Sequence, residues 1–240
     1  EILIGLVGSE MCIRDSLFMA PGNDVRVASE IATWMPGYKE LSVGNHLFMT
    51  IQWMLSSFAN EGKAFFIAIW AAGFLLLVKS KKAKVYQSLA VVFSVVALLP
   101  YAGISFFSEM GIGYIDIEQC LTELPTWQTM TTQNRIAFFW WIAAVLFTLV
   151  LLWKVTGHSV FISMVFLGGI ASEAVLHFSP TIYASGARVY YLTDLMYLFI
   201  ILWMVMRMDS EKKKNLFIAG AAALGIICLL YTSDAADEED

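Results

Sequence analysis

The residues with the clearest chemical potential are a carboxyl group and an imidazole four positions apart, Glu173 and His177. Positions four apart lie on one face of a helix, so the two side chains can act together. Three interpretations stay open: a general acid and base, two ligands of a metal ion, or a structural hydrogen-bonded pair. A complete metal site is not supported, because only His46 among the other histidines is expected on the same side as this pair.

A second candidate is the segment Ala-Pro-Gly-Asn-Asp-Val-Arg at residues 20–26. Proline and glycine favour a tight turn, and Asn23 is a good cap for a helix that follows it. Asp24 and Arg26 then project from the first turn of that helix. The planar guanidinium of Arg26 suits bidentate binding of a phosphate or carboxylate. The alternative is a capped surface helix with a local ion pair.

A third candidate is the segment Ser-Pro-Thr-Ile-Tyr-Ala-Ser-Gly-Ala-Arg at residues 179–188, which contains Tyr183 and ends in Arg188. It is rich in turn-forming residues and lies between two apolar runs. Arg188 could hold the phosphate of a lipid-linked molecule at a membrane interface. Alternatively, it anchors the following apolar run by extending its charge towards water.

The composition indicates which elements must position these groups. Of the 240 residues, 59% are hydrophobic and only 15% are charged. Soluble domains contain about 45–50% hydrophobic residues and about 25% charged residues. This excludes an ordinary cytosolic enzyme, a disordered chain and a nucleic-acid-binding domain. No nucleotide-binding or hydrolase motif is present, so no cofactor is evident. A divalent metal is compatible with the sequence, but no ligand set supports one.

The two ends of the chain resemble translated sequencing adaptors. Residues 1–16 contain LVGSEMCIRDS and residues 228–240 contain CLLYTSDAADE, and we expect neither segment to be native. Setting them aside removes one basic and eight acidic residues, which changes the net charge from −5 to +2. Cys120 then remains as a single cysteine, which cannot form an internal disulfide. Without these two segments the chain has neither a native start nor a native stop, so we expect Leu17–Ile227 to be an internal fragment of a longer protein.

Long apolar runs separated by charged clusters predict an all-α fold, a multi-pass transmembrane helical bundle. We expect residues 17–63 to form an external segment and residues 64–227 the bundle. The external segment contains Asn45–Phe58, whose mixed polar and apolar pattern predicts an interfacial or re-entrant helix. Five complete spans and a truncated sixth are expected at Ala64–Val78, Val85–Phe107, Ile136–Trp153, Ser159–Leu176, Tyr190–Met206 and Leu216–Ile227.

Basic residues orient these spans. Nine fall on one side, at Lys79–Lys84, Lys154 and Arg207–Lys214, and five are spread over longer segments on the other. The positive-inside rule therefore predicts that the first group faces the cytoplasm. The segments that carry Arg26 and Arg188 are then external, and Glu173 lies near the external end of its span.

Together, APGN-x-x-R at residues 20–26, the apolar bundle and SP-x₇-R at residues 179–188 resemble a family of bacterial multi-pass membrane proteins. That family is similar to the glycosyltransferases that use polyprenyl-phosphate sugars. The resemblance implies sugar transfer, on the external face, from such a donor to a glycan or lipid of the cell envelope. The catalytic carboxylate of that superfamily lies in an early external loop, which would precede Leu17, so no catalytic residue is assigned here.

The resemblance also implies roles for the candidate residues. Arg26 and Arg188, with Asn23 and Asp24 beside the first, would bind the lipid phosphate. Three others would line the site: Glu173, His177 and Tyr183. Two alternatives remain, a transporter or flippase for an envelope lipid or polymer, in which Glu173 couples transport to an ion, and a non-catalytic scaffold. Membrane lipids are expected partners in every case, and nucleic acids in none.

Overall fold

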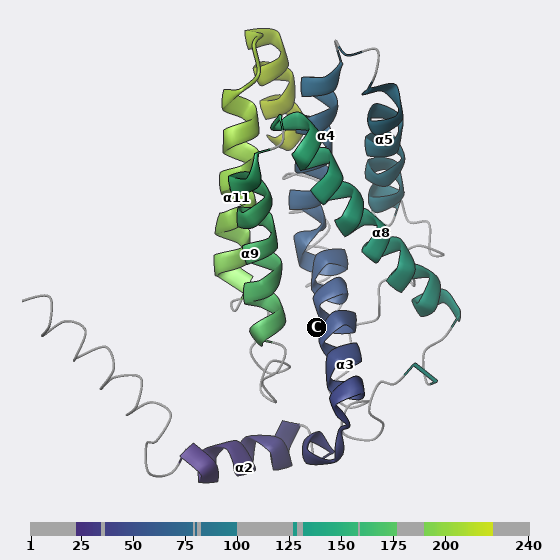
Figure 1. The fold of residues 1–240 in the computed structure, drawn as a ribbon, viewed down its shortest axis with the longest axis vertical. Helices are drawn as coiled ribbons and strands as arrows, with labels where there is room; N and C mark the ends of the chain where they lie inside the picture. Colours follow the sequence, from purple (N-terminus) through teal and green to yellow (C-terminus); the bar gives the residue numbers. More distant parts are fainter. Residues whose placement is uncertain are drawn as a thin grey trace, which may run out of the picture.

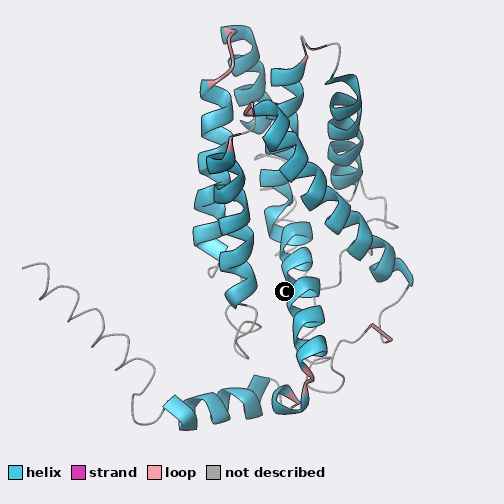
Figure 2. Cartoon of the chain, viewed as in Figure 1, coloured by secondary structure: helices cyan, strands magenta, loops and turns pink. Residues whose placement is uncertain are grey.

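The computed structural model of this chain describes residues 23–34, 37–78, 80, 83–99, 127–128, 132–157, 159–176 and 190–222. Every regular element within these ranges is a helix, so the predicted all-α class is confirmed (Figure 2). Both adaptor-like ends lie outside the described residues.

The helices follow the apolar runs of the sequence (Figure 1). In chain order they are α2 (Asn23–Trp34), the 3₁₀ turn η1 (Tyr38–Glu40), α3 (Val43–Ser57), the π-helical turn η2 (Phe58–Gly62), α4 (Lys63–Leu77), α5 (Lys84–Leu98), α8 (Thr132–Val155), α9 (Val160–Leu176) and α11 (Tyr191–Met206). A further helix covers residues 211–222.

The first long helix is continuous from α3 through η2 into α4. Ser42 caps its start, where the Ser42 side chain accepts a hydrogen bond from Asn45 N at 3.2 Å. Ser57, Phe58, Gly62 and Lys63 all keep right-handed helical dihedral angles, so the π turn does not interrupt the helix. At a rise of 1.5 Å per residue, residues 43–77 extend over roughly 50 Å. The interfacial position proposed for Asn45–Phe58 stays a prediction.

The helix α4 is the centre of the bundle. It packs against α5, α8 and α11, while α9 packs against α8 and α11, and α3 contacts α8 and α9 (Figure 1). A small residue allows α8 close to α4, because a Cβ atom at Gly73 would lie 2.7 Å from Leu151 Cδ2. Phe66, Ile69 and Trp70 of α4 are fully buried and form the middle of the core.

Among the described residues, one helix is clearly long and apolar enough to cross a membrane, the part of α8 over Arg135–Val155. The apolar helices α5, α9 and α11 contain 15–17 residues. They therefore extend over about 22–26 Å, less than the ~30 Å of a bilayer core. The prediction of several membrane crossings stays a prediction, and the last part of the expected span Val85–Phe107 lies outside the described residues.

The connections between helices define two ends of the bundle. At one end of the bundle α4, α8 and α11 end, and α5, α9 and the helix at residues 211–222 begin (Figure 1). We call this the basic end because Lys84, Lys154 and Lys212–Lys214 lie there. The helix α2 lies across the opposite end, which we call the α2 end. The start of α3 and the end of α9 lie nearest to α2, whereas α5 ends near the middle of the bundle (Figure 1).

Candidate functional site

Glu173 is a fully buried carboxyl group near the α2 end. It lies one turn before the end of α9 and is 1% exposed. The Ser57 hydroxyl, at the last residue of α3, donates a hydrogen bond to Glu173 Oε1. A carboxyl group within a helical bundle is energetically unfavourable unless it is paired, so its position favours a functional role.

The Ser57 hydroxyl gives this contact two possible states. Its oxygen also lies 2.8 Å from the Met54 carbonyl oxygen, although a hydroxyl has only one proton to donate. When Glu173 is ionised, Ser57 donates to the carboxylate. When Glu173 is protonated, it can donate to Ser57, whose proton is then free for Met54. The pair can therefore accept and release a proton through a change of hydrogen bonding alone.

Two further buried polar groups lie on the helices around Glu173. Tyr197 of α11 is 1% exposed and Gln52 of α3 is 4% exposed. Their Oη and Oε1 atoms have no hydrogen-bond partner among the described residues. Glu173 is close enough to act electrostatically on the Tyr197 hydroxyl. Buried polar atoms are nearly always hydrogen-bonded, so these unpaired atoms indicate a place for a polar ligand. We call Ser57, Glu173 and Tyr197 the polar site.

Four phenylalanine rings pack around that of Tyr197, and three of them are fully buried. Phe58, Phe66 and Phe166 are each at most 1% exposed, and their ring centroids lie 5.6–6.4 Å from that of Tyr197. Aromatic rings at these distances form a dense apolar layer. This layer lies beside Tyr197 of the polar site.

The backbone is irregular where it meets the polar site. The π turn η2 begins directly after Ser57 and ends at Gly62. Short π segments inside α-helices are rare and frequently occur at functional sites, because they rotate one part of a helix relative to the other. Here the turn lies between Ser57 of α3 and the start of α4.

Of the side chains predicted to form a site, the structure describes only Glu173. Asn23, Asp24 and Arg26 lie in the first turn of α2, as expected, but their side chains are outside the described residues. His177, Tyr183 and Arg188 lie outside them entirely, so the pairing of Glu173 with His177 is untested. Within the described ranges, no group of three His, Cys, Asp or Glu residues could hold a metal ion.

The buried polar side chains of α3 and α11 were not predicted from the sequence. Gln52 and Ser56 are polar residues four positions apart in a largely apolar helix, and both are buried. This spacing could have indicated an inward polar stripe. Tyr197 gave no such signal, because a tyrosine in an apolar helix is also typical of a membrane interface.

Comparisons with known proteins add no relative, since no family model, curated protein or solved structure matches this chain. The fold and site therefore define only a class: an all-helical bundle with one clearly membrane-length helix and a buried acidic group near one end.

Proposed function

We propose that the chain is part of a multi-pass protein of a bacterial inner membrane, with the basic end towards the cytoplasm. The outward faces of the helices support this, because they carry large apolar side chains in place of charges. Phe139 and Leu146 of α8, Met164 of α9 and Leu202 of α11 are each 54–62% exposed. Apolar surface of this extent is unfavourable in water and favourable in lipid. The lysines at the basic end agree with the positive-inside rule.

We further propose that the protein transfers a sugar from a polyprenyl-phosphate donor to a glycan or lipid of the cell envelope. The observation that carries this proposal is the convergence of three features on the α2 end. The helix α2, with Arg26 in its first turn, lies there. So do the end of α9 and the start of α11, which flank the segment that contains Arg188. The buried Glu173 is one turn from the same end.

In this proposal the arginines bind the donor, and three other candidate residues line the acceptor side. The guanidinium groups of Arg26 and Arg188 bind the donor phosphate, whose charge grows on the leaving group during transfer. Asn23 and Asp24 support Arg26, and Glu173, His177 and Tyr183 line the acceptor side. Glu173 and Ser57 orient an acceptor hydroxyl by hydrogen bonding, and the phenylalanine layer excludes water from the core beside it. The residue that deprotonates the acceptor is not assigned.

Binding of the donor headgroup is the first test. Vesicles containing the protein are incubated with radiolabelled polyprenyl phosphate, and the retained label is measured for R26A, R188A, R26K and R188K. We expect each alanine variant to bind at least ten-fold more weakly. The lysine variants should recover only part of the affinity, because lysine keeps the charge but loses the bidentate geometry. Wild-type binding in both alanine variants would contradict the proposed headgroup site.

A second candidate function is ion-coupled transport of an envelope lipid or polymer, and the burial of Glu173 is the observation that favours it. The variant E173Q separates the two functions, because glutamine keeps the hydrogen bond and removes the proton exchange. Transport would lose its dependence on the proton gradient in E173Q while R26A and R188A remain active. Sugar transfer would fail in the arginine variants while flipping of a fluorescent lipid continues.

A further inference from the structure

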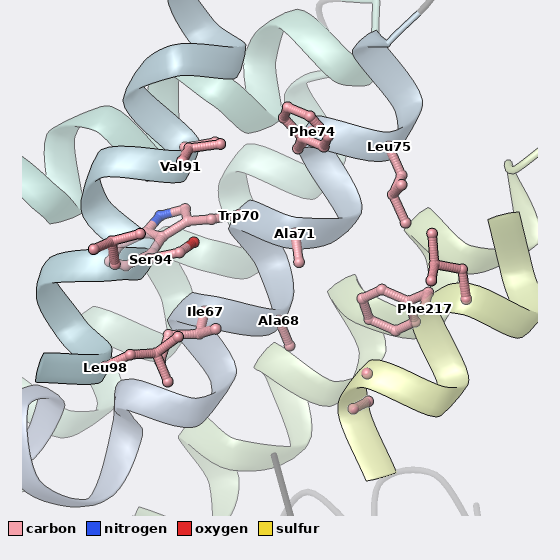
Figure 3. A pocket seen from close by; sticks show the side chains of 15 residues that line it. Ile67, Ala68, Trp70, Ala71, Phe74, Leu75, Val91, Ser94, Leu98 and Phe217 are labelled. Atoms are coloured by element: carbon pink, nitrogen blue, oxygen red, sulfur yellow. The ribbon is translucent and has the colours of Figure 1, made fainter. Parts of the chain in front are cut away.

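An apolar groove opens on the side of the bundle, away from the polar site. It lies between α4, α5 and the helix at residues 211–222 and has a volume of about 500 Å³ (Figure 3). This is within the range of about 300–1,000 Å³ that is typical of ligand pockets. Alanines create much of the space, since Ala68 and Ala71 face the groove from α4. Val91 and Leu98 of α5 and Phe217 form its other walls.

A lysine is held at the rim of this groove. Lys213 lies one turn before Phe217, and its Nζ donates a hydrogen bond to the Leu75 carbonyl oxygen at 2.7 Å. Leu75 itself lines the groove. The carbonyl oxygen is a neutral acceptor, so this bond positions the ammonium group, and no ion pair of Lys213 occurs among the described residues.

A second lysine lies on the same side from another helix. Lys84 is exposed and begins α5, seven residues before Val91. A spacing of seven residues is two helical turns, so Lys84 lies on the face of α5 that lines the groove. Two helices therefore each carry an ammonium group on the basic side of the same apolar groove.

We propose that this groove binds one hydrocarbon chain of an anionic phospholipid, whose phosphate is held by Lys84 and Lys213. The apolar walls match the chain, and the two lysines match the charge of the headgroup. Basic pockets between membrane helices on the cytoplasmic side bind anionic lipids in this way. The site rests on the membrane position proposed for the bundle, but not on sugar transfer, and it lies at the end opposite to Arg26 and Glu173.

Lipid retention tests the charged part of the site. The full chain in detergent micelles is titrated with phosphatidylglycerol or phosphatidylcholine, and bound lipid is counted by native mass spectrometry. We expect phosphatidylglycerol to be retained preferentially. K84Q and K213Q should each weaken its retention about five-fold. The matched control is K154Q, since Lys154 is exposed at the same end but lies on α8, and it should behave as wild type. Equal retention of both lipids would overturn the proposal.

Filling the groove tests the apolar part without changing any charge. Gly220 lines the groove, and no atom lies within 4 Å of a Cβ atom added there, so G220L can fill the space without a clash. We expect G220L to lose phosphatidylglycerol and G220A to keep most of it. Wild-type retention in G220L would overturn the proposal, as would a dimer that G220L dissociates, because the groove would then be an interface between two copies.

The same spectra identify the source of the lipid. If polyprenyl phosphate displaces phosphatidylglycerol, the groove binds an anionic lipid as proposed. Its natural ligand is then polyprenyl phosphate. R26A and R188A should retain phosphatidylglycerol as wild type does, so the failure of either proposal leaves the other intact.

Discussion

At the middle of the bundle, Trp70 Nε1 donates a hydrogen bond to Thr148 Oγ1 at 2.8 Å, and that hydroxyl donates to the Ala144 carbonyl oxygen at 2.7 Å. Towards the α2 end, Tyr197 and Gln52 are equally buried, but their Oη and Oε1 atoms have no hydrogen-bond partner among the described residues. The two regions lie in one core and differ in how completely their polar atoms are paired.

The paired polar groups, Trp70 and Thr148, stabilise the fold. The Oη of Tyr197 and the Oε1 of Gln52, unpaired in the part of the chain that the structure describes, do not contribute in this way. A paired hydrogen bond inside a bundle contributes modestly to stability, whereas an unpaired buried group lowers it. The Trp70–Thr148 pair has every feature of a structural contact. The Gln52 Oε1 and Tyr197 Oη atoms have no such partner among the described residues, and local departures from good pairing are typical of functional sites. Substitutions at the Trp70–Thr148 pair should therefore lower mainly the stability of the fold. Substitutions at the polar site should lower mainly the function of the protein.

The largest effect on stability is expected from W70A. Trp70 is fully buried against Phe66 and Phe93, with ring centroids 5.8 and 5.5 Å away. Removing the indole leaves a large cavity and takes away the donor to Thr148 Oγ1, so the free energy of unfolding should fall by about 3–5 kcal/mol. Titration with sodium dodecyl sulfate in mixed micelles measures this. The control L202A changes an outward side chain and should alter the free energy by less than about 0.5 kcal/mol.

A smaller loss is expected from G73A, where α4 and α8 pack most closely. The added Cβ atom would lie 2.7 Å from Leu151 Cδ2 and 3.0 Å from Cγ, so Leu151 or the helices must shift. Overpacking of this kind destabilises by about 1–3 kcal/mol. The matched control is G168A in α9, where the nearest atom, Met196 Sδ, is 3.8 Å away. That variant should be neutral or stabilising, and an equal loss in both would mean that helix contact at Gly73 is not the cause.

These contacts also mark the limit of what the sequence could predict. The helices follow from apolar runs and charged boundaries, and all five complete runs contain a helix. The continuity of α3 and α4 was not expected, because Asn60, Glu61 and Lys63 interrupt the apolar pattern. The backbone accommodates them with the π turn η2.

The candidate site could be predicted only in part. Glu173 is conspicuous as a carboxylate in an apolar run, but its partner Ser57 is 116 positions away. Spacing rules describe neighbours on one helix, and they contain no information on which helices meet. The pairing of Ser57 with Glu173 depends on how α3 packs against α9, and this arises from the whole core.

A still smaller effect should follow from T148V, which keeps the shape of Thr148 and removes its hydroxyl. The Trp70 N–H then loses its acceptor in a site with no exposed surface. We expect a loss of about 1–2 kcal/mol in the free energy of unfolding. A double-mutant cycle with W70F tests the cause, because the two losses should not add if they report the same hydrogen bond.

The smallest effect on stability should come from Y197F, the counterpart of T148V in the polar site. The Tyr197 hydroxyl has no hydrogen-bond partner among the described residues, so its removal ends an unfavourable burial without breaking a bond. The free energy of unfolding should change by less than about 0.5 kcal/mol. If the hydroxyl binds a polar ligand, polyprenyl-phosphate binding or transport should nevertheless fall several-fold. A loss of stability equal to that of T148V, with full function, would instead mean that Tyr197 is structural and that the two regions of the core do not differ.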